Sequence, residues 1–178
     1  MALVVALSVP IGNVAAVWPL ARHGGHSYAR ELLRNPLILS TLAGLLANVG
    51  GLQWPAPVIT TLQRIGVAAL PIGLMAVGAG LQFGRLKASP ALAGALLALR
   101  HAAMPVIAIG LAWALALPPA QRAIVILFGA LPTASSSYVL AARMGGDAGF
   151  VAGLVTVSTL LGMVTIPCWL ALSSVLPG

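Results

Sequence analysis

Long apolar stretches make up most of this chain, and they restrict its fold more than any other feature. A helix that crosses the hydrocarbon core of a bilayer, roughly 30 Å thick, needs about 20 predominantly apolar residues. Six stretches have about that length, the second being rather short; they cover residues 2–21, 37–52, 58–83, 91–117, 123–142 and 148–176. Because a transmembrane β-strand needs only about 9–11 residues, the sequence predicts an all-α integral membrane protein with six transmembrane helices.

Charged residues are scarce, and this scarcity excludes several classes of function. Hydrophobic residues make up 60% of the 178 residues and charged residues 6%, against roughly 25% charged in a soluble domain. Glu31 and Asp147 are the two acidic residues, and Cys168 is the single cysteine. Paired-carboxylate catalysis, a metal site, a bound cofactor and an intrachain disulfide are therefore not expected. The nine Lys and Arg residues are scattered between apolar runs, so we expect no nucleic-acid partner.

The distribution of these cations predicts the orientation of the six spans. Along an alternating path, six cations fall on one side, namely Arg22, Arg30, Arg34, Arg85, Lys87 and Arg143. The other side has Arg122, joined at most by Arg64. Because cytoplasmic loops carry the excess of Lys and Arg, the first side is expected in the cytoplasm, with residues 22–35 as a cytoplasmic linker. Both termini are then non-cytoplasmic. A start directly inside a span indicates the remainder of a longer chain.

The fifth stretch contains the strongest candidate site, the run Leu-Pro-Thr-Ala-Ser-Ser-Ser-Tyr at residues 131–138. Pro132 has no N–H and clashes with the preceding turn, so it interrupts a helix. Hydroxyls follow it at once, and a half-broken helix can aim backbone groups at an ion or a small anion. The alternative is an ordinary proline kink whose backbone is satisfied by those hydroxyls. The candidate substrate-binding residues here are Pro132, Thr133, Ser135, Ser136 and Tyr138.

Three further polar residues lie at membrane depth. Arg100 is ten residues from Pro90, roughly 15 Å along a helix, so it should face protein or a water cavity, where it could attract an anionic substrate. Alternatively, it is a structural cation on freed carbonyls. His101 titrates in a range that suits proton coupling. Asn13 follows Pro10 and Gly12, and it predicts either a loosened helix that binds substrate or an interhelical hydrogen bond.

Trp18, Trp54, Trp113 and Trp169 fall near segment ends, as an aromatic belt at the two membrane surfaces requires. An intramembrane serine enzyme would need an activated nucleophile. Ser135–Ser137 with His101 could be drawn as such a dyad, but no nucleophile-elbow motif surrounds the serines. The sequence therefore predicts that the protein is not an enzyme.

Several pieces of the chain, in order, resemble a known family. They are Arg-Asn-Pro-Leu-Ile at 34–38, the glycine-rich run at 68–81, Arg100 five residues before Pro105, Leu-Pro-Thr-Ala at 131–134, Val-Leu-Ala at 139–141, Gly-Gly-Asp at 145–147 and Val-Ser-Thr-Leu-Leu at 157–161. Together they resemble the second half of a bacterial auxin efflux carrier, a relative of the plant PIN carriers.

The resemblance implies a ten-helix protein of two inverted five-helix repeats, with the crossed-helix (NhaA/bile-acid-symporter-like) architecture. The six spans would be helices five to ten. Residues 1–21 and 84–178 would belong to the transport domain, with a proline-broken helix at 123–142, and residues 36–83 would form two scaffold helices that also carry a homodimer contact. Pro132 would match the second of two helix breaks. The first break lies in a repeat that this chain lacks, so a truncated or partial family member is expected.

The resemblance further implies a secondary efflux carrier of small organic anions or carboxylates that works by alternating access in the bacterial inner membrane. Its partners would be the carboxylate substrate and the lipid bilayer. One alternative is another crossed-helix carrier, such as a bile-acid-type sodium symporter. Sodium sites there use acidic side chains, and none lies inside a span here. The other alternative is an inactive membrane fragment.

Overall fold

The computed structural model describes residues 11–12, 14–18 and 33–175, and every regular element in these residues is a helix. The all-α prediction is therefore confirmed for the described part of the chain. Asn13, most of the first predicted span and most of the predicted linker lie outside the described residues. The helices are α3 (Pro36–Val49), α4 (Ala56–Ala79), α5 (Phe83–Ala88), α6 (Pro90–Ala98), η1 (Leu99–Ala103), α7 (Met104–Ala114), α8 (Pro119–Ala130), α9 (Ser136–Arg143) and α10 (Ala148–Val175).

Three helical segments in the described residues are long and apolar enough to cross a membrane: Ala56–Ala79, Pro90–Ala114 and Ala148–Ser173. Their apolar side chains are largely exposed, as lipid-facing surfaces require; Leu70, Ile72 and Met75 on α4 are examples. Two of the predicted spans correspond to shorter apolar helices. α3 has 14 residues, or about 21 Å, and α8 has 12. The structure thus supports three of the six predicted spans by length.

The chain divides into two compact units. The first comprises residues 1–72 and 140–146, and the second comprises residues 73–139 and 147–178. In the first unit, Val17, Ile38 and Leu140 form a buried apolar cluster. The Asn35 side chain accepts a hydrogen bond of 3.0 Å from the N–H of Leu37 and so caps the start of α3.

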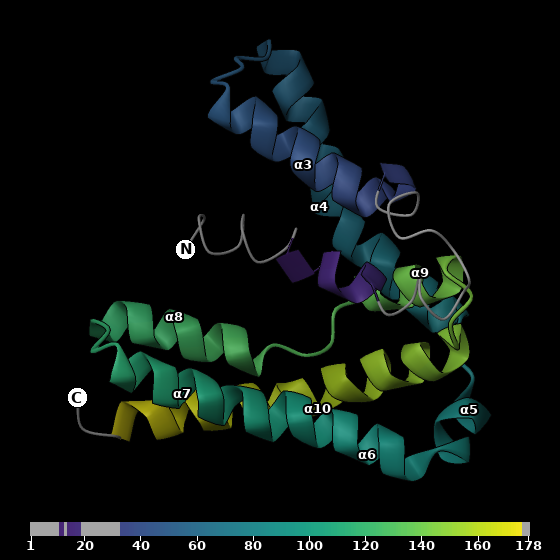
Figure 1. Ribbon diagram of the computed structural model, residues 1–178, viewed down its shortest axis with the longest axis vertical. Helices are drawn as coiled ribbons and strands as arrows, with labels where there is room; N and C mark the ends of the chain where they lie inside the picture. The colour runs from purple at the N-terminus through teal and green to yellow at the C-terminus, as the bar shows by residue number, and fades with distance from the viewer. Residues whose placement is uncertain (1–10, 13, 19–32, 176–178) are drawn as a thin grey trace. The chain divides into compact units, whose positions relative to one another are not determined.

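The second unit is built around a helical span that runs through α6, η1 and α7 (Figure 1). α8 packs against α7 and α10, and α10 also packs against η1 and α5. Gly129 permits the close approach of α8 and α7, since a β-carbon there would lie 2.7 Å from the Ala108 β-carbon. A buried cluster of Val77, Ala152 and Val155 joins the last turn of α4 to α10.

Candidate functional site at the interrupted helix

The segment that carries Pro132 is an interruption between two helices. α8 ends at Ala130, residues 131–134 have no regular structure, and α9 begins at Ser136. The first local hydrogen bonds after the interruption run from Ser137 N–H to the Ala134 carbonyl (3.0 Å) and from Tyr138 N–H to the Ser135 carbonyl (3.1 Å). The backbone N–H groups of Ala134, Ser135 and Ser136 make no hydrogen bond with any described residue. They are the donors that a helix start leaves for a capping group or a ligand.

Arg100 brings a positive charge to this interruption. Its Nη2 donates a long hydrogen bond of 3.5 Å to the carbonyl of Pro132. Its Nε is buried and has no hydrogen-bond partner in the described part of the chain. The guanidinium is therefore held beside the helix break with donor capacity to spare, a state that is costly unless another group accepts.

Arg100 lies on a π-helical turn that the sequence patterns did not indicate. Residues Leu99–Ala103 form η1, and the N–H of Met104 donates to the carbonyl of Leu99, five residues earlier. Such turns inside α-helices often occur at functional sites. Pro105 follows directly and has no N–H for the carbonyl of His101. That carbonyl instead accepts a hydrogen bond of 2.8 Å from Nε1 of Trp169 on α10, so Trp169 has a structural role besides the interfacial one predicted for it.

The imidazole of His101 joins η1, α10 and the interruption through hydrogen bonds. His101 is 7% exposed and Ser158, on α10, is 0% exposed. The His101 Nε2 lies 2.9 Å from the Ser158 Oγ, and its Nδ1 lies 3.0 Å from the Thr165 Oγ1. The N–H of Thr133 donates to the same Ser158 Oγ at 2.9 Å. Ser158 thus links the histidine to the backbone of the interrupted helix.

Ser158, Thr165 and Trp169 are functional candidates that the sequence analysis missed. They are spaced i, i+7 and i+11 on α10, a helix without a charged residue. This spacing places them on one helix face. Hydrogen-bonding side chains that recur on one face of an apolar transmembrane helix indicate contacts with another helix, and this pattern could have identified the three residues.

Ser135 and Tyr138, two of the predicted site residues, lie against glycines of the 73–80 segment. A β-carbon added at Gly73 would lie 2.9 Å from the Ser135 Oγ. One added at Gly80 would lie 2.5 Å from the Tyr138 ring carbons Cε2 and Cζ. Glycine at both positions is therefore needed for the observed placement of the two side chains. Ser136 is partly buried at the start of α9.

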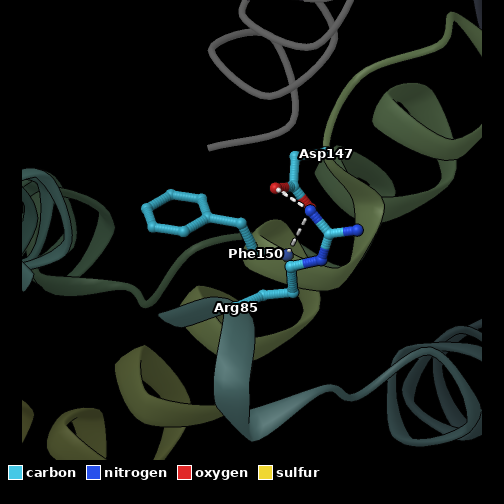
Figure 2. Close-up of polar contacts among 3 residues, drawn as sticks. All are labelled: Arg85, Asp147 and Phe150. Atoms are coloured by element: carbon cyan, nitrogen blue, oxygen red, sulfur yellow. Dashed lines mark hydrogen bonds and ion pairs between the residues drawn. The ribbon is translucent and has the colours of Figure 1, made fainter. Parts of the chain in front are cut away.

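An exposed ion pair lies at the other end of α10. Arg85 on α5 and Asp147 are 3.6 Å apart, and Asp147 Oδ1 accepts a 3.0 Å hydrogen bond from the N–H of Phe150, which caps α10 (Figure 2). Both side chains are at least half exposed, so this pair adds little stability. Within the residues that the structure describes, no three His, Cys, Asp or Glu side chains gather as a metal site would require.

Comparison with known families identifies the chain. The family described as "Membrane transport protein" matches residues 21–170, which include every element of the second unit up to Trp169. The chain belongs to this family, the auxin efflux carrier family. It is therefore an integral membrane protein of a transporter family and not an enzyme, as the sequence predicted.

Two curated relatives of this carrier family share part of their sequence with the chain. An "Uncharacterized transporter" of Methanothermobacter thermautotrophicus is 30% identical over 135 residues, which is 75% of this chain and 44% of the relative. A "Putative malonate transporter" of Rhizobium meliloti is 29% identical over 139 residues, which is 78% of this chain and 43% of the relative. The chain thus spans less than half the length of these carriers. No solved structure matches it.

Proposed function

We propose that this chain provides the anion-binding half of a secondary carrier that moves small carboxylates across the membrane by alternating access. The observation that carries the proposal is the meeting of Arg100 with the interrupted helix at Pro132. There a cation contacts the carbonyl of Pro132, four residues before α9 begins at Ser136. The first N–H groups of α9 make no hydrogen bond with the described residues. The malonate named for the Rhizobium meliloti relative is a carboxylate of the expected kind.

Arg100 has no acidic partner among the residues that the structure describes. The one acidic side chain in the described residues is Asp147, and it is paired with Arg85. A cation at membrane depth is costly unless it is paired, and the Nε of Arg100 has a donor to spare. A carboxylate can accept from the guanidinium with one oxygen and from helix N–H groups with the other. Substrate would therefore supply a negative charge that the described residues do not provide near Arg100.

The proposal includes the arrangement of the helices in the complete carrier and their orientation in the membrane. The chain would form helices five to ten of a ten-helix carrier, with residues 36–83 as scaffold and residues 1–21 and 84–178 as the moving transport domain. The scaffold helices would carry the homodimer contact, and the Arg-rich loops would lie on the cytoplasmic side of the inner membrane. Labelling of single cysteines placed beside Arg34 and Arg122, from either side of the membrane, tests the orientation; labelling of both from the same side would refute it.

Binding of a carboxylate panel to the purified chain in detergent tests the proposed function. Malonate, malate and indole-3-acetate should raise the unfolding temperature in a saturable way, since a ligand at 100 times its Kd stabilises the folded state by about 2.7 kcal/mol. Arg100→Ala should abolish this shift. Arg64→Ala is the matched control, because it removes an equal charge from an exposed position on α4. If none of the acids stabilises the wild-type chain, or if both variants respond equally, the proposal is wrong.

A further inference from the structure

We propose that His101 is a proton-binding site of the carrier and that Ser158 transmits the state of this proton to the backbone of Thr133. The inference rests on the proposed carrier function, and it adds a second transported or regulatory species, the proton. The contacts that carry it are the three hydrogen bonds that join Thr165, His101, Ser158 and the interrupted helix. Thr165 and Ser158 act as positioning residues, since neither needs to touch the substrate.

The surroundings of His101 can hold the ring in either charge state without the loss of a hydrogen bond. A hydroxyl group can donate one hydrogen bond and accept two. In the neutral ring with its proton on Nδ1, Nδ1–H donates to the Thr165 Oγ1 and the Ser158 hydroxyl donates to Nε2. In the cation, both ring N–H groups donate and both hydroxyl oxygens accept. Uptake of a proton therefore requires that the Ser158 hydroxyl hydrogen turn away from the ring toward another acceptor, for which a carbonyl of its own helix is available.

This rearrangement has a defined effect on the interrupted helix. While the Ser158 hydroxyl donates to the neutral ring, its oxygen is polarised and accepts more strongly from the N–H of Thr133. Once the ring is cationic, the same oxygen must accept from both Nε2–H and Thr133 N–H. The two donors then compete, and the Thr133–Ser158 bond, 2.9 Å long in the structure, weakens. The proton on His101 thus loosens the first residue after Pro132, beside the N–H groups proposed to hold the anion.

Among the described helices packed against η1, charged and titratable groups are few, and α6 has none. Arg100 is its neighbour on the same π turn, and α7 contributes no ionisable side chain. α8 contributes Arg122 on its first turn, and α10 contributes the exposed thiol of Cys168. None of these is a carboxylate that could hold the ring permanently charged. The bound anion is the group left to balance the proton, so anion and proton binding favour each other by linkage.

The experiment that tests the inference is a pH titration of the purified full chain in lipid nanodiscs, followed by nitrogen-15 NMR without any carboxylate present. The ring nitrogens of His101, assigned by their loss in His101→Gln, should titrate, and the amide proton of Thr133 should shift upfield along the same curve. In Ser158→Ala, the ring should still titrate while the Thr133 amide stays still. Because no ligand is added, the result is independent of whether carboxylates bind.

Two valine variants on α10 provide a second, matched comparison. Thr165→Val removes the hydroxyl at Nδ1, whereas Thr159→Val removes a hydroxyl that donates only to its own helix, at the Val155 carbonyl. Thr165→Val should displace the His101 titration curve, and Thr159→Val should leave it unchanged. A ring that does not titrate over about pH 5–8 would overturn the inference. The inference would also be wrong if the chemical shift of the Thr133 amide proton did not change as the ring titrates. It would be wrong as well if that shift changed equally in wild type and in Ser158→Ala.

Discussion

Gly129 offers a direct measurement of how tightly α8 is held against α7 just before the interruption. In Gly129→Ala, the new β-carbon would lie 2.7 Å from the Ala108 β-carbon and 3.2 Å from the Met104 carbonyl oxygen. Carbon atoms pack at about 3.5 Å or more, so the helices must separate by roughly 0.8 Å. No rotamer change relieves this contact, because a β-carbon and a backbone oxygen cannot rotate away.

The magnitude follows from two opposing effects. Overpacking of a close contact costs about 1–3 kcal/mol, and replacement of glycine by alanine in a helix contributes up to about 1 kcal/mol of stabilisation. We therefore expect Gly129→Ala to lower the free energy of unfolding by about 1–2 kcal/mol. Gly110→Ala on α7 is the control. Its β-carbon would have nothing within 4 Å, so this variant should be more stable than wild type by about 0.5–1 kcal/mol.

Equilibrium unfolding in mixed micelles, followed by circular dichroism, measures both variants. The expected difference between them is about 2 kcal/mol, which is well above the error of such curves. Gly129→Ala should also weaken malonate binding, since α8 leads directly into the Pro132 segment. If the two variants gain stability equally, α7 and α8 do not pack as closely as described and the reasoning fails.

Two further substitutions test the contacts around the site. Gly80→Ala should push the Tyr138 ring aside, since a β-carbon would lie 2.5 Å from two ring carbons. We expect this variant to bind malonate about tenfold more weakly, equivalent to about 1.4 kcal/mol. Gly78→Ala is the control and should bind malonate normally, because its β-carbon would have nothing within 4 Å. Trp169→Phe should leave the carbonyl of His101 without its hydrogen-bond donor, and it should lower the free energy of unfolding by about 1–3 kcal/mol. Trp113→Phe, at an exposed position, should change it little, and equal losses in the two variants would contradict this role.

Much of the architecture could be predicted because it depends on local properties of the chain. Apolar length predicts helices that suit a bilayer, and the missing N–H of Pro132 accounts for the end of α8 at Ala130. Arg100 could be placed beside the interruption only as a hypothesis, because its partner carbonyl is 32 residues away. That contact requires the tertiary packing of η1 against α8 and α10.

The polar partners of His101 could not be predicted from the sequence for the same reason. Ser158 and Thr165 lie 57 and 64 residues after His101 in the chain. In addition, hydroxyls on apolar helices more often donate to carbonyls of their own helix, as those of Thr156 and Thr159 do. Within residues 33–175, fewer spans than predicted have helices of full membrane length, because apolar runs such as 37–52 continue through turn residues that end the helix at Val49.

The π turn at Leu99–Ala103 also fixes the rotational phase of the helix that contains it. Ala93 and Pro105, both buried, are 12 residues apart, so a continuous α-helix at about 100° per residue would turn them about 120° away from each other. The wider turn absorbs one extra residue, which reduces the offset to about 20° and aligns Ala93 with the buried stripe of Pro105, Ala108 and Ala112. Deletion of a single residue here would restore ordinary helical winding with 11 residues between the two positions, so α6 would still face the same neighbours and only the wide turn that carries Arg100 and His101 would be lost.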